Sequence, residues 1–277
     1  MLKHLPGRPP QSSSTINNLS MPPSKPTLVF VHGGWHDPSC FDSVRVPLES
    51  AGYKCRVPAL PSIGELSATK TSSDDVAVVH GIISDCVSKG EDVIVIGHSN
   101  GGLKANGALK GLVGPDSTVA DSTGKILGLG IIAGLLPPVG KMGASAPAPQ
   151  SHLSDNRWVF SETDPTMLPR DPTNLFYNDM SPEQAAYWTA RIKPMHTQEM
   201  FGGYYEAWHH VPVSYLVTTK DNGISEAQQD AIINDAKAEG GIVFATHVEA
   251  SHSPFLSVPD KVAAWIRRAA EEEFVTT

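Results

Sequence analysis

The sequence predicts an α/β fold, a doubly wound and mostly parallel sheet that carries an inserted helical cap. Three observations lead to this fold class. Six short apolar runs alternate with stretches of helical periodicity, which is the order typical of parallel sheets. Several of the runs are apolar at consecutive positions, as in strands that are covered on both faces. One long proline-rich segment, 137–210, interrupts the alternation.

The apolar runs define the expected strands, and the periodic stretches define the expected helices. The strands are expected at 28–32, 53–57, 93–97, 126–133, 213–218 and 242–248. The helices are expected at 74–88, 100–112, 225–238 and 259–272. Asp74 suits the N-terminal cap of the first helix, and Pro259 suits the first turn of the last.

This pattern predicts one core with an insertion rather than two independent domains. Residues 26–136 and 211–277 are expected to form the core, and 137–210 the cap. Within the cap, helices are expected near 181–192 and 197–209. Residues 1–25, rich in Pro, Ser and Asn, are expected to be a flexible N-terminal arm.

Composition and charge exclude several classes of protein. The 277 residues carry a formal net charge of −8, which argues against a nucleic-acid binder or an anionic membrane surface as partner. The longest nearly apolar run, 126–136, is shorter than the roughly 20 residues of a membrane-spanning helix. The three cysteines show neither a disulfide framework nor zinc-ligand spacing. Because the N-terminus also has no apolar signal region, a cytoplasmic location is expected.

The strongest motif is Gly97-His98-Ser99-Asn100-Gly101, which follows an apolar run and precedes a helical stretch. A G-x-S-x-G string in this context is typical of a serine nucleophile on a sharp strand-to-helix turn. The glycines give neighbouring elements room to pass close to the backbone. The N-terminus of the following helix favours negative charge that develops beside the hydroxyl.

A second glycine-rich loop, His32-Gly33-Gly34-Trp35, follows the first strong strand. Attack of a serine on a carbonyl carbon produces an oxyanion that needs two preorganised N–H donors. We expect the backbone amides of Asn100 and Gly34 to supply them, with Trp35 as the alternative to Gly34.

The base and the acid are expected after the last two strands. Of the eleven histidines, His252 alone lies after the final strand and just before the C-terminal helix. Asp221 follows the strand 213–218 in a D-N-G turn, and the preceding strand is followed by no carboxylate. We therefore expect Ser99 as nucleophile, His252 as general base and Asp221 as the acid that orients the histidine.

With these motifs the sequence resembles the α/β-hydrolase superfamily, in particular its small esterase and hydroxynitrile-lyase-like branch with a helical cap. The resemblance rests on VFVHGGW, VIVIGHSNGG, VSYLVTTKDNGI and ASHSPFLSVP, and it spans residues 26 to about 268. It implies the same assignment of Ser99, His252, Asp221, Gly34 and Asn100. Plant-type hydroxynitrile lyases carry Thr and Lys where this chain has Gly33 and Ser253, so the resemblance favours an esterase or lactonase over cyanohydrin cleavage.

The function expected from the sequence is hydrolysis of a carboxylic ester or lactone of a small, largely apolar substrate through an acyl-enzyme. Aromatic and histidine side chains are expected to contact the substrate, namely Trp35, His36, Trp188, Tyr204 and Trp208. No cofactor and no metal are expected. A small-molecule substrate is the expected partner, and the sequence is compatible with a homodimer.

Two alternatives remain open at this point. One is non-hydrolytic use of the same triad in a cyclase, an acyl transferase or a carbon–carbon lyase of secondary metabolism. The other is a ligand receptor that retains the triad.

Overall fold

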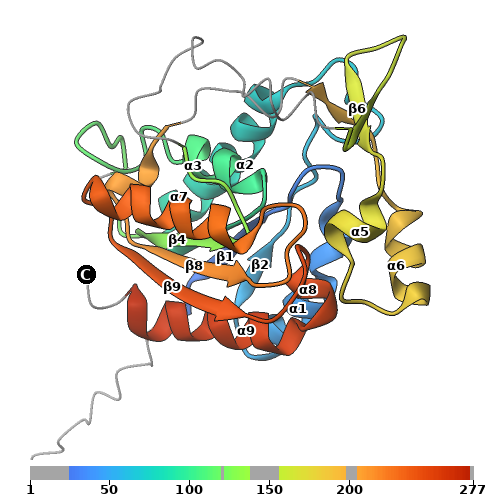
Figure 1. Ribbon diagram of the computed structural model, residues 1–277. Helices are drawn as coiled ribbons and strands as arrows, with labels where there is room; N and C mark the ends of the chain where they lie inside the picture. Colours follow the sequence, from blue (N-terminus) through green and yellow to red (C-terminus); the bar gives the residue numbers. More distant parts are fainter. Residues whose placement is uncertain (1–24, 120–121, 138–155, 198–204, 275–277) are drawn as a thin grey trace, which may run out of the picture.

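The computed structural model describes residues 25–119, 122–137, 156–197 and 205–274. Its centre is a six-stranded sheet in which every neighbouring pair of strands is parallel (Figure 1). Across the sheet, the strands follow in the order β2 (Lys54–Arg56), β1 (Thr27–Val31), β3 (Val93–His98), β4 (Ile126–Ile132), β8 (Val213–Thr218) and β9 (Val243–Val248).

Helices cover both faces of this sheet, which explains why its strands are apolar at consecutive positions. In β1, Val29 and Val31 face one core cluster, whereas Leu28 and Phe30 face the other, because successive side chains of a strand point to opposite faces. The first face is covered by α2 (Ser72–Ser88), α3 (Gly101–Ala108) and α7 (Glu226–Ala238). The second is covered by α1 (Asp42–Ser50), α8 (Pro254–Ser257) and α9 (Pro259–Arg268), which leads into a π-helical turn, η4 (Ala269–Glu273).

Within the insert between β4 and β8, the part at 156–197 lies beyond the carboxyl ends of the strands, at the right of Figure 1. It contains a second, antiparallel sheet of β5 (Trp158–Phe160), β6 (Thr166–Pro169) and β7 (Met195–His196). Two helices accompany it, α5 (Pro172–Phe176) and α6 (Pro182–Thr189). A separate cluster of buried side chains, including Trp35, joins this insert to the core.

The structure differs from the expected elements in three places. The insert is a mixed sheet and helix unit rather than an all-helical cap, because its short strands pair locally through the 158–169 hairpin and through β7. Of the helix expected at 197–209, the described part contains only the 3₁₀ turn η3 (Ala207–His209). The expected cap of α2 is also corrected. Thr71 is the N-cap, and Asp74 is the third helical residue of a capping box.

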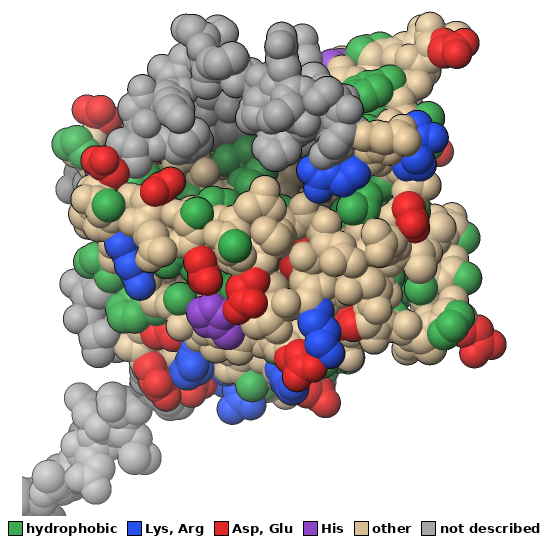
Figure 2. All heavy atoms as spheres, viewed as in Figure 1, with side chains coloured by type: hydrophobic (Ala, Val, Ile, Leu, Met, Phe, Trp, Pro, Cys, Tyr) green, Lys and Arg blue, Asp and Glu red, His purple; other side chains and the backbone are tan. Residues whose placement is uncertain are grey.

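The surface carries both signs of charge. Figure 2 shows acidic and basic side chains interspersed on the visible face, without an extended patch of one sign among the described residues of that face. Some of them pair, for example Lys220 with Glu249 at 2.5 Å. Within the described ranges, no helix is long and apolar enough to cross a membrane.

Candidate active site

Ser99 lies on the tight turn between strand β3 and helix α3. Its φ angle is +53°, in the left-handed region that a residue with a Cβ atom adopts at a cost of about 1 kcal/mol or more. The surrounding backbone holds it there. The Ser99 amide donates to the Ile132 carbonyl (3.1 Å), and the Ser99 carbonyl accepts from the Gly102 amide (3.0 Å). The sharp turn presents the hydroxyl at the carboxyl edge of the sheet, as the motif predicts.

Two glycines allow this turn to pack. A Cβ atom on Gly97 would lie 2.7 Å from the Gly102 Cα, so a side chain there would collide with the start of helix α3. A Cβ atom on Gly101 would collide with the Val31 carbonyl oxygen of the adjacent strand β1. The two outer glycines of the motif are therefore a steric requirement of the turn.

The structure brings Ser99, His252 and Asp221 into one hydrogen-bonded chain. His252 Nδ1 lies 2.8 Å from Asp221 Oδ2, and His252 Nε2 lies 2.9 Å from Ser99 Oγ. A carboxylate only accepts, so Nδ1 carries the proton and Nε2 is the acceptor for the serine hydroxyl. Both His252 and Asp221 are buried.

The Asp221 carboxylate is held from both of its oxygens. Oδ1 accepts from the amides of Gly223 (2.7 Å) and Ile224 (2.8 Å). Oδ2 accepts from Thr218 Oγ1 (2.9 Å) and Gln229 Nε2 (3.2 Å) as well as from the imidazole. The sequence analysis did not identify Thr218 and Gln229. A short polar side chain at the end of a strand and a buried Gln in the first turns of the next helix are the signals that could have found them.

The imidazole of His252 is packed between two rings. Phe176 from the insert lies with its ring centre 5.4 Å away at 32°, and His98 lies 4.8 Å away at 54°. His98 also donates from Nε2 to the His252 carbonyl (2.9 Å), which restrains the loop that carries the base. Phe176 is a further contact that sequence patterns did not identify, because it comes from a helix of only five residues, α5.

The glycine loop after β1 passes directly against the nucleophile. A Cβ atom on Gly33 would lie 3.0 Å from the Ser99 Cβ and 2.7 Å from His98 Nδ1, so only glycine fits this approach. Gly34 is the next residue of this loop, and Asn100, the N-cap of α3, is the residue after Ser99. Gly33 and Ser99 meet at this contact, and each is followed directly by a predicted oxyanion donor, Gly34 and Asn100 respectively.

Two of the predicted substrate contacts have structural partners of their own. Trp35, at φ +64°, stacks on Trp158 at 4.7 Å and donates from Nε1 to the Met167 carbonyl (3.0 Å). His36 uses both ring nitrogens, with Nδ1 at 2.7 Å from the Gly34 carbonyl and Nε2 at 2.8 Å from the Tyr177 hydroxyl. Both ring nitrogens of His36 are therefore engaged by protein groups in this structure, and its contact with a substrate stays a prediction.

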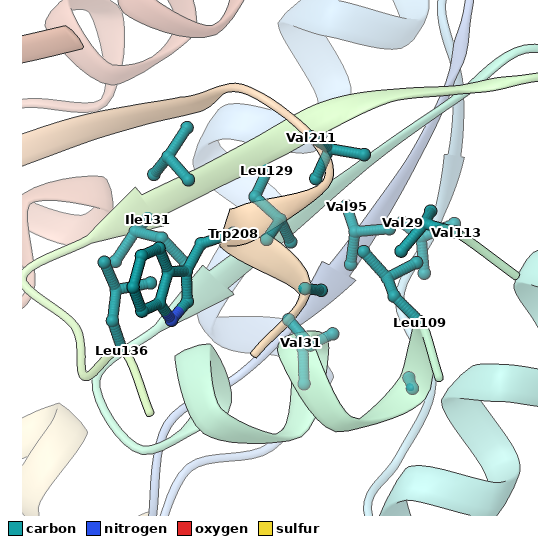
Figure 3. Close-up of a cluster of buried hydrophobic side chains, with 14 of the residues drawn as sticks. Val29, Val31, Val95, Leu109, Val113, Leu129, Ile131, Leu136, Trp208 and Val211 are labelled. Atoms are coloured by element: carbon teal, nitrogen blue, oxygen red, sulfur yellow. The ribbon is translucent and has the colours of Figure 1, made fainter. Parts of the chain in front are cut away.

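The other three predicted substrate contacts have different outcomes. Trp188 of helix α6 is partly buried and packs against the clusters of both the insert and the core. Tyr204 lies outside the described residues. Trp208 lies in the main core rather than at the site, beside Ile131 and Leu136 (Figure 3). Its large ring helps cover the sheet, so the expected substrate contact at Trp208 is corrected.

Three buried histidines around the site are neutral. Burial lowers the pKa of His32 to about 3 and the pKa of His36 to about 4. Burial also lowers the pKa of His98 well below its ordinary value of 6.5. These rings therefore act near neutral pH as hydrogen-bonding groups with one donor and one acceptor nitrogen each.

This burial predicts a loss of stability in mild acid. Below pH 6.5 the unfolded chain binds a proton at His36, whereas the folded chain binds it only near pH 4. The free energy of unfolding therefore falls as the pH falls from 6.5 to about 4. At His36 this difference costs roughly 2 kcal/mol at pH 5 relative to neutral pH. We expect the His36→Gln variant to lose about 2 kcal/mol less between pH 7.5 and 5 than the native chain. Urea unfolding at both pH values measures this, and equal losses in the two proteins would contradict it.

Away from Ser99, three side chains that are common metal ligands lie close together, which their sequence spacing did not reveal. The ligand atoms of Glu226, Asp230 and His247 all lie within 4.8 Å of one another. The side chains of Asp230 and His247 are 44% and 46% exposed, on helix α7 and strand β9. His247 Nε2 approaches Asp230 Oδ1 to 3.3 Å, as in a surface pair.

Comparison with known proteins places this architecture in a family. The model of the alpha/beta hydrolase family matches residues 28–265. The chain therefore belongs to the alpha/beta hydrolase family, an enzyme family with hydrolases and esterases among its members.

Individual proteins are similar to this chain over almost their whole length. The alpha/beta hydrolase nvfD of Aspergillus novofumigatus is 26% identical over 253 residues, spanning 90% of this chain and 98% of the relative. The structure is similar to that of tomato methylketone synthase I, with a TM-score of 0.69, 17% identity and coverage of 91% of this chain and 99% of the other. It is also similar to a methylesterase from Arabidopsis, with a TM-score of 0.64, 21% identity and coverage of 88% and 98%.

Proposed function

We propose that this alpha/beta hydrolase is a serine hydrolase that cleaves a carboxylic ester or lactone through an acyl-enzyme. The observation that carries the proposal is the continuous relay from Asp221 through His252 to the Ser99 hydroxyl, with steps of 2.8 and 2.9 Å. These distances are within the range in which a proton passes between a nucleophile and its base.

In the acylation step, Ser99 Oγ attacks the acyl carbon while His252 Nε2 takes the hydroxyl proton. The buried Asp221 carboxylate stabilises the imidazolium that forms and keeps its Nδ1–H in the orienting hydrogen bond. The carbonyl oxygen becomes an oxyanion, which in this proposal accepts hydrogen bonds from the amides of Gly34 and Asn100. His252 then gives its proton to the alkoxide leaving group as the tetrahedral intermediate collapses.

In the deacylation step, His252 removes a proton from a water molecule that attacks the acyl-enzyme. The second tetrahedral intermediate collapses to the free acid, and the proton returns to Ser99 Oγ. Every bond formed and broken is accounted for by water and the ester, so the cycle needs no cofactor.

The surroundings of the site favour a small, largely apolar substrate. Among the described residues near the relay, the Phe176 ring packs against His252, and the Trp35 ring stacks on Phe176 at 5.6 Å. Aromatic walls of this kind bind apolar acyl or alcohol groups, with a few polar atoms fixing the orientation.

Labelling with a fluorophosphonate, followed by a panel of p-nitrophenyl esters, tests the proposal. We expect one phosphonyl adduct per chain, located on Ser99 by peptide mass mapping, and turnover of the esters with a preference for some acyl length. A heat-denatured sample serves as the control and should remain unlabelled.

The same panel run in ¹⁸O-water distinguishes hydrolysis from the non-hydrolytic alternatives. Hydrolysis puts one water-derived oxygen into the acid product, whereas a cyclase, acyl transferase or lyase does not. An adduct on a residue other than Ser99, or a product without the heavy oxygen, would refute the proposed reaction.

A further inference from the structure

One short segment of the insert, from Asn174 to Asp179, contacts three of the four loops that carry the proposed catalytic groups, all except the turn of Ser99. It reaches the acid loop, the histidine loop and the glycine loop by side-chain hydrogen bonds. These bonds are Asn178 Nδ2 to the Lys220 carbonyl (2.9 Å), the Ser251 amide to Asp179 Oδ2 (2.8 Å) and the Tyr177 hydroxyl to His36 Nε2 (2.8 Å).

The protonation pattern of the last bond follows from its partners. His36 Nδ1 lies 2.7 Å from the Gly34 carbonyl oxygen, which only accepts, so Nδ1 carries the hydrogen. Burial keeps this imidazole neutral, so Nε2 is bare and accepts from the Tyr177 hydroxyl. The Gly34 carbonyl therefore fixes the tautomer of His36, and the Tyr177 hydroxyl donates to the ring nitrogen that this tautomer leaves bare.

This donation has a geometric consequence for the glycine loop. A trans peptide is planar, so its N–H points away from its C=O. The Gly34 carbonyl shares a peptide with the Trp35 amide, and the Gly33 carbonyl shares one with the Gly34 amide. His36 fixes the first peptide, and His32 Nδ1, 3.1 Å from the Gly33 carbonyl, fixes the second. The two buried imidazoles thereby set the direction of both candidate oxyanion donors.

The insert supports the same loop at two further points. The Lys193 amide donates to the Trp35 carbonyl at 3.0 Å. Met195 of strand β7 packs so closely on Gly34 that a Cβ atom there would lie 2.7 Å from its sulfur. The left-handed backbone of Trp35 is thus held by contacts on each side, and the Tyr177–His36 bond links the insert to the Gly34–Trp35 peptide through side chains.

We propose that Tyr177 is a positioning residue that orients the Gly34–Trp35 peptide through His36, and with it the Trp35 amide, the alternative oxyanion donor of the glycine loop. The inference rests on the proposed function, because the oriented amide matters only when a tetrahedral oxyanion forms at Ser99. Tyr177 itself touches no reacting atom in this scheme. Its contribution is the orientation of one peptide group.

The test is the Tyr177→Phe variant, which removes one hydroxyl and keeps the ring. Misdirecting an oxyanion donor lowers kcat, and we expect a loss of about tenfold or more with KM changed less than about twofold. A trifluoromethyl ketone with the same acyl chain forms an oxyanion adduct at the nucleophile, so its Ki should rise by the same factor as kcat/KM falls. A purely structural role for Tyr177 would not produce this proportionality.

Tyr205→Phe is the matched control. Its hydroxyl also makes a hydrogen bond, to the Val113 carbonyl at 3.3 Å, but the ring stacks on His210 away from the glycine loop. This variant should keep both kcat and the inhibitor Ki. Should Tyr177→Phe fail to fold, His36→Asn breaks the same link and should lose kcat by a similar factor.

Combining Tyr177→Phe with His36→Leu decides whether the two residues act as one unit. If Tyr177 acts through His36, the double variant is no slower than His36→Leu alone. The inference would be overturned if the losses in kcat of the two single variants multiplied in the double variant. It would also be overturned by an unchanged kcat in Tyr177→Phe, or by an equal loss of kcat in Tyr205→Phe. A native chain that neither reacts with the fluorophosphonate at Ser99 nor turns over esters would instead overturn the proposed function, and the inference with it.

Discussion

The Ser99→Ala variant is expected to lose turnover of activated aryl esters by about 10⁶-fold in kcat, because it removes the nucleophile from a relay whose members act as a unit. Folding should survive the change. Alanine has the same Cβ atom as serine, so the left-handed backbone at φ +53° bears no new contact. Steady-state kinetics with a p-nitrophenyl ester and a thermal unfolding curve measure the two quantities.

Ser214→Ala is the matched control for this variant. Ser214 is a fully buried serine in strand β8, and its hydroxyl has no hydrogen-bond partner among the described residues. The same chemical change there should leave kcat within about threefold, since it touches no group of the relay. Turnover by Ser99→Ala within about tenfold of the native value would mean that another group attacks the ester.

The second large effect is expected at a buried ion pair between helices α2 and α3. Lys104 Nζ lies 2.6 Å from Asp75 Oδ2, and both side chains are 0% exposed. Asp75 also accepts from the amide (2.9 Å) and the hydroxyl (2.5 Å) of Ser62. Replacing Asp75 with leucine leaves an ammonium group in the core without its counter-charge. Such a loss destabilises a protein by about 3–5 kcal/mol.

The free energy of unfolding of Asp75→Leu, measured in urea, should therefore fall by about 3–5 kcal/mol. The double variant Asp75→Leu/Lys104→Met should recover most of this loss, because it removes both charges and keeps the volume. On the same helix, the exposed pair of Lys89 and Asp85 (2.7 Å, 63% and 58% exposed) provides the control. Asp85→Ala should cost no more than about 0.5 kcal/mol. Equal costs at the two sites would show that burial does not set the strength of the Asp75–Lys104 pair.

The relay was predictable from sequence because of a general property of parallel sheets. Ser99, Asp221 and His252 each follow a strand, and the carboxyl ends of parallel strands meet at one edge of the sheet. The strand β8 coincides with its predicted range, since its six apolar or small residues end where the polar Thr219 and Lys220 begin. Identifying the strands was therefore enough to expect the three side chains at one edge.

Helix α1 shows where local patterns are insufficient. Its nine residues include Pro47, which lacks an amide hydrogen and normally argues against a helix interior. The helix forms because Val44 and Leu48 are buried against the core. Tertiary packing thus outweighs the local preference, and the amino-acid pattern of 42–50 alone does not reveal the helix.

The insert shows the same limit at the site itself. Phe176 is the last residue of a five-residue helix in a proline-rich segment, and Tyr177 is the C-cap of that helix. They nevertheless touch His252 and His36, which lie 76 and 141 positions away in the chain. Trp208 looked like a similar aromatic contact but packs on the sheet instead. Aromatic composition indicates buried surface, but it does not indicate which surface is buried.

The amino-acid order alone was enough to place the parallel sheet, the serine turn and the acid and base loops, because periodicity, glycine spacing and chain order are local properties. Only the folded chain reveals which side chains hold those loops. The Asp75–Lys104 pair, the Gln229 bond to Asp221 and the Tyr177–His36 link join residues that are distant in sequence or carry no motif. Such contacts depend on how helices and loops pack in three dimensions, and no sequence period records that packing.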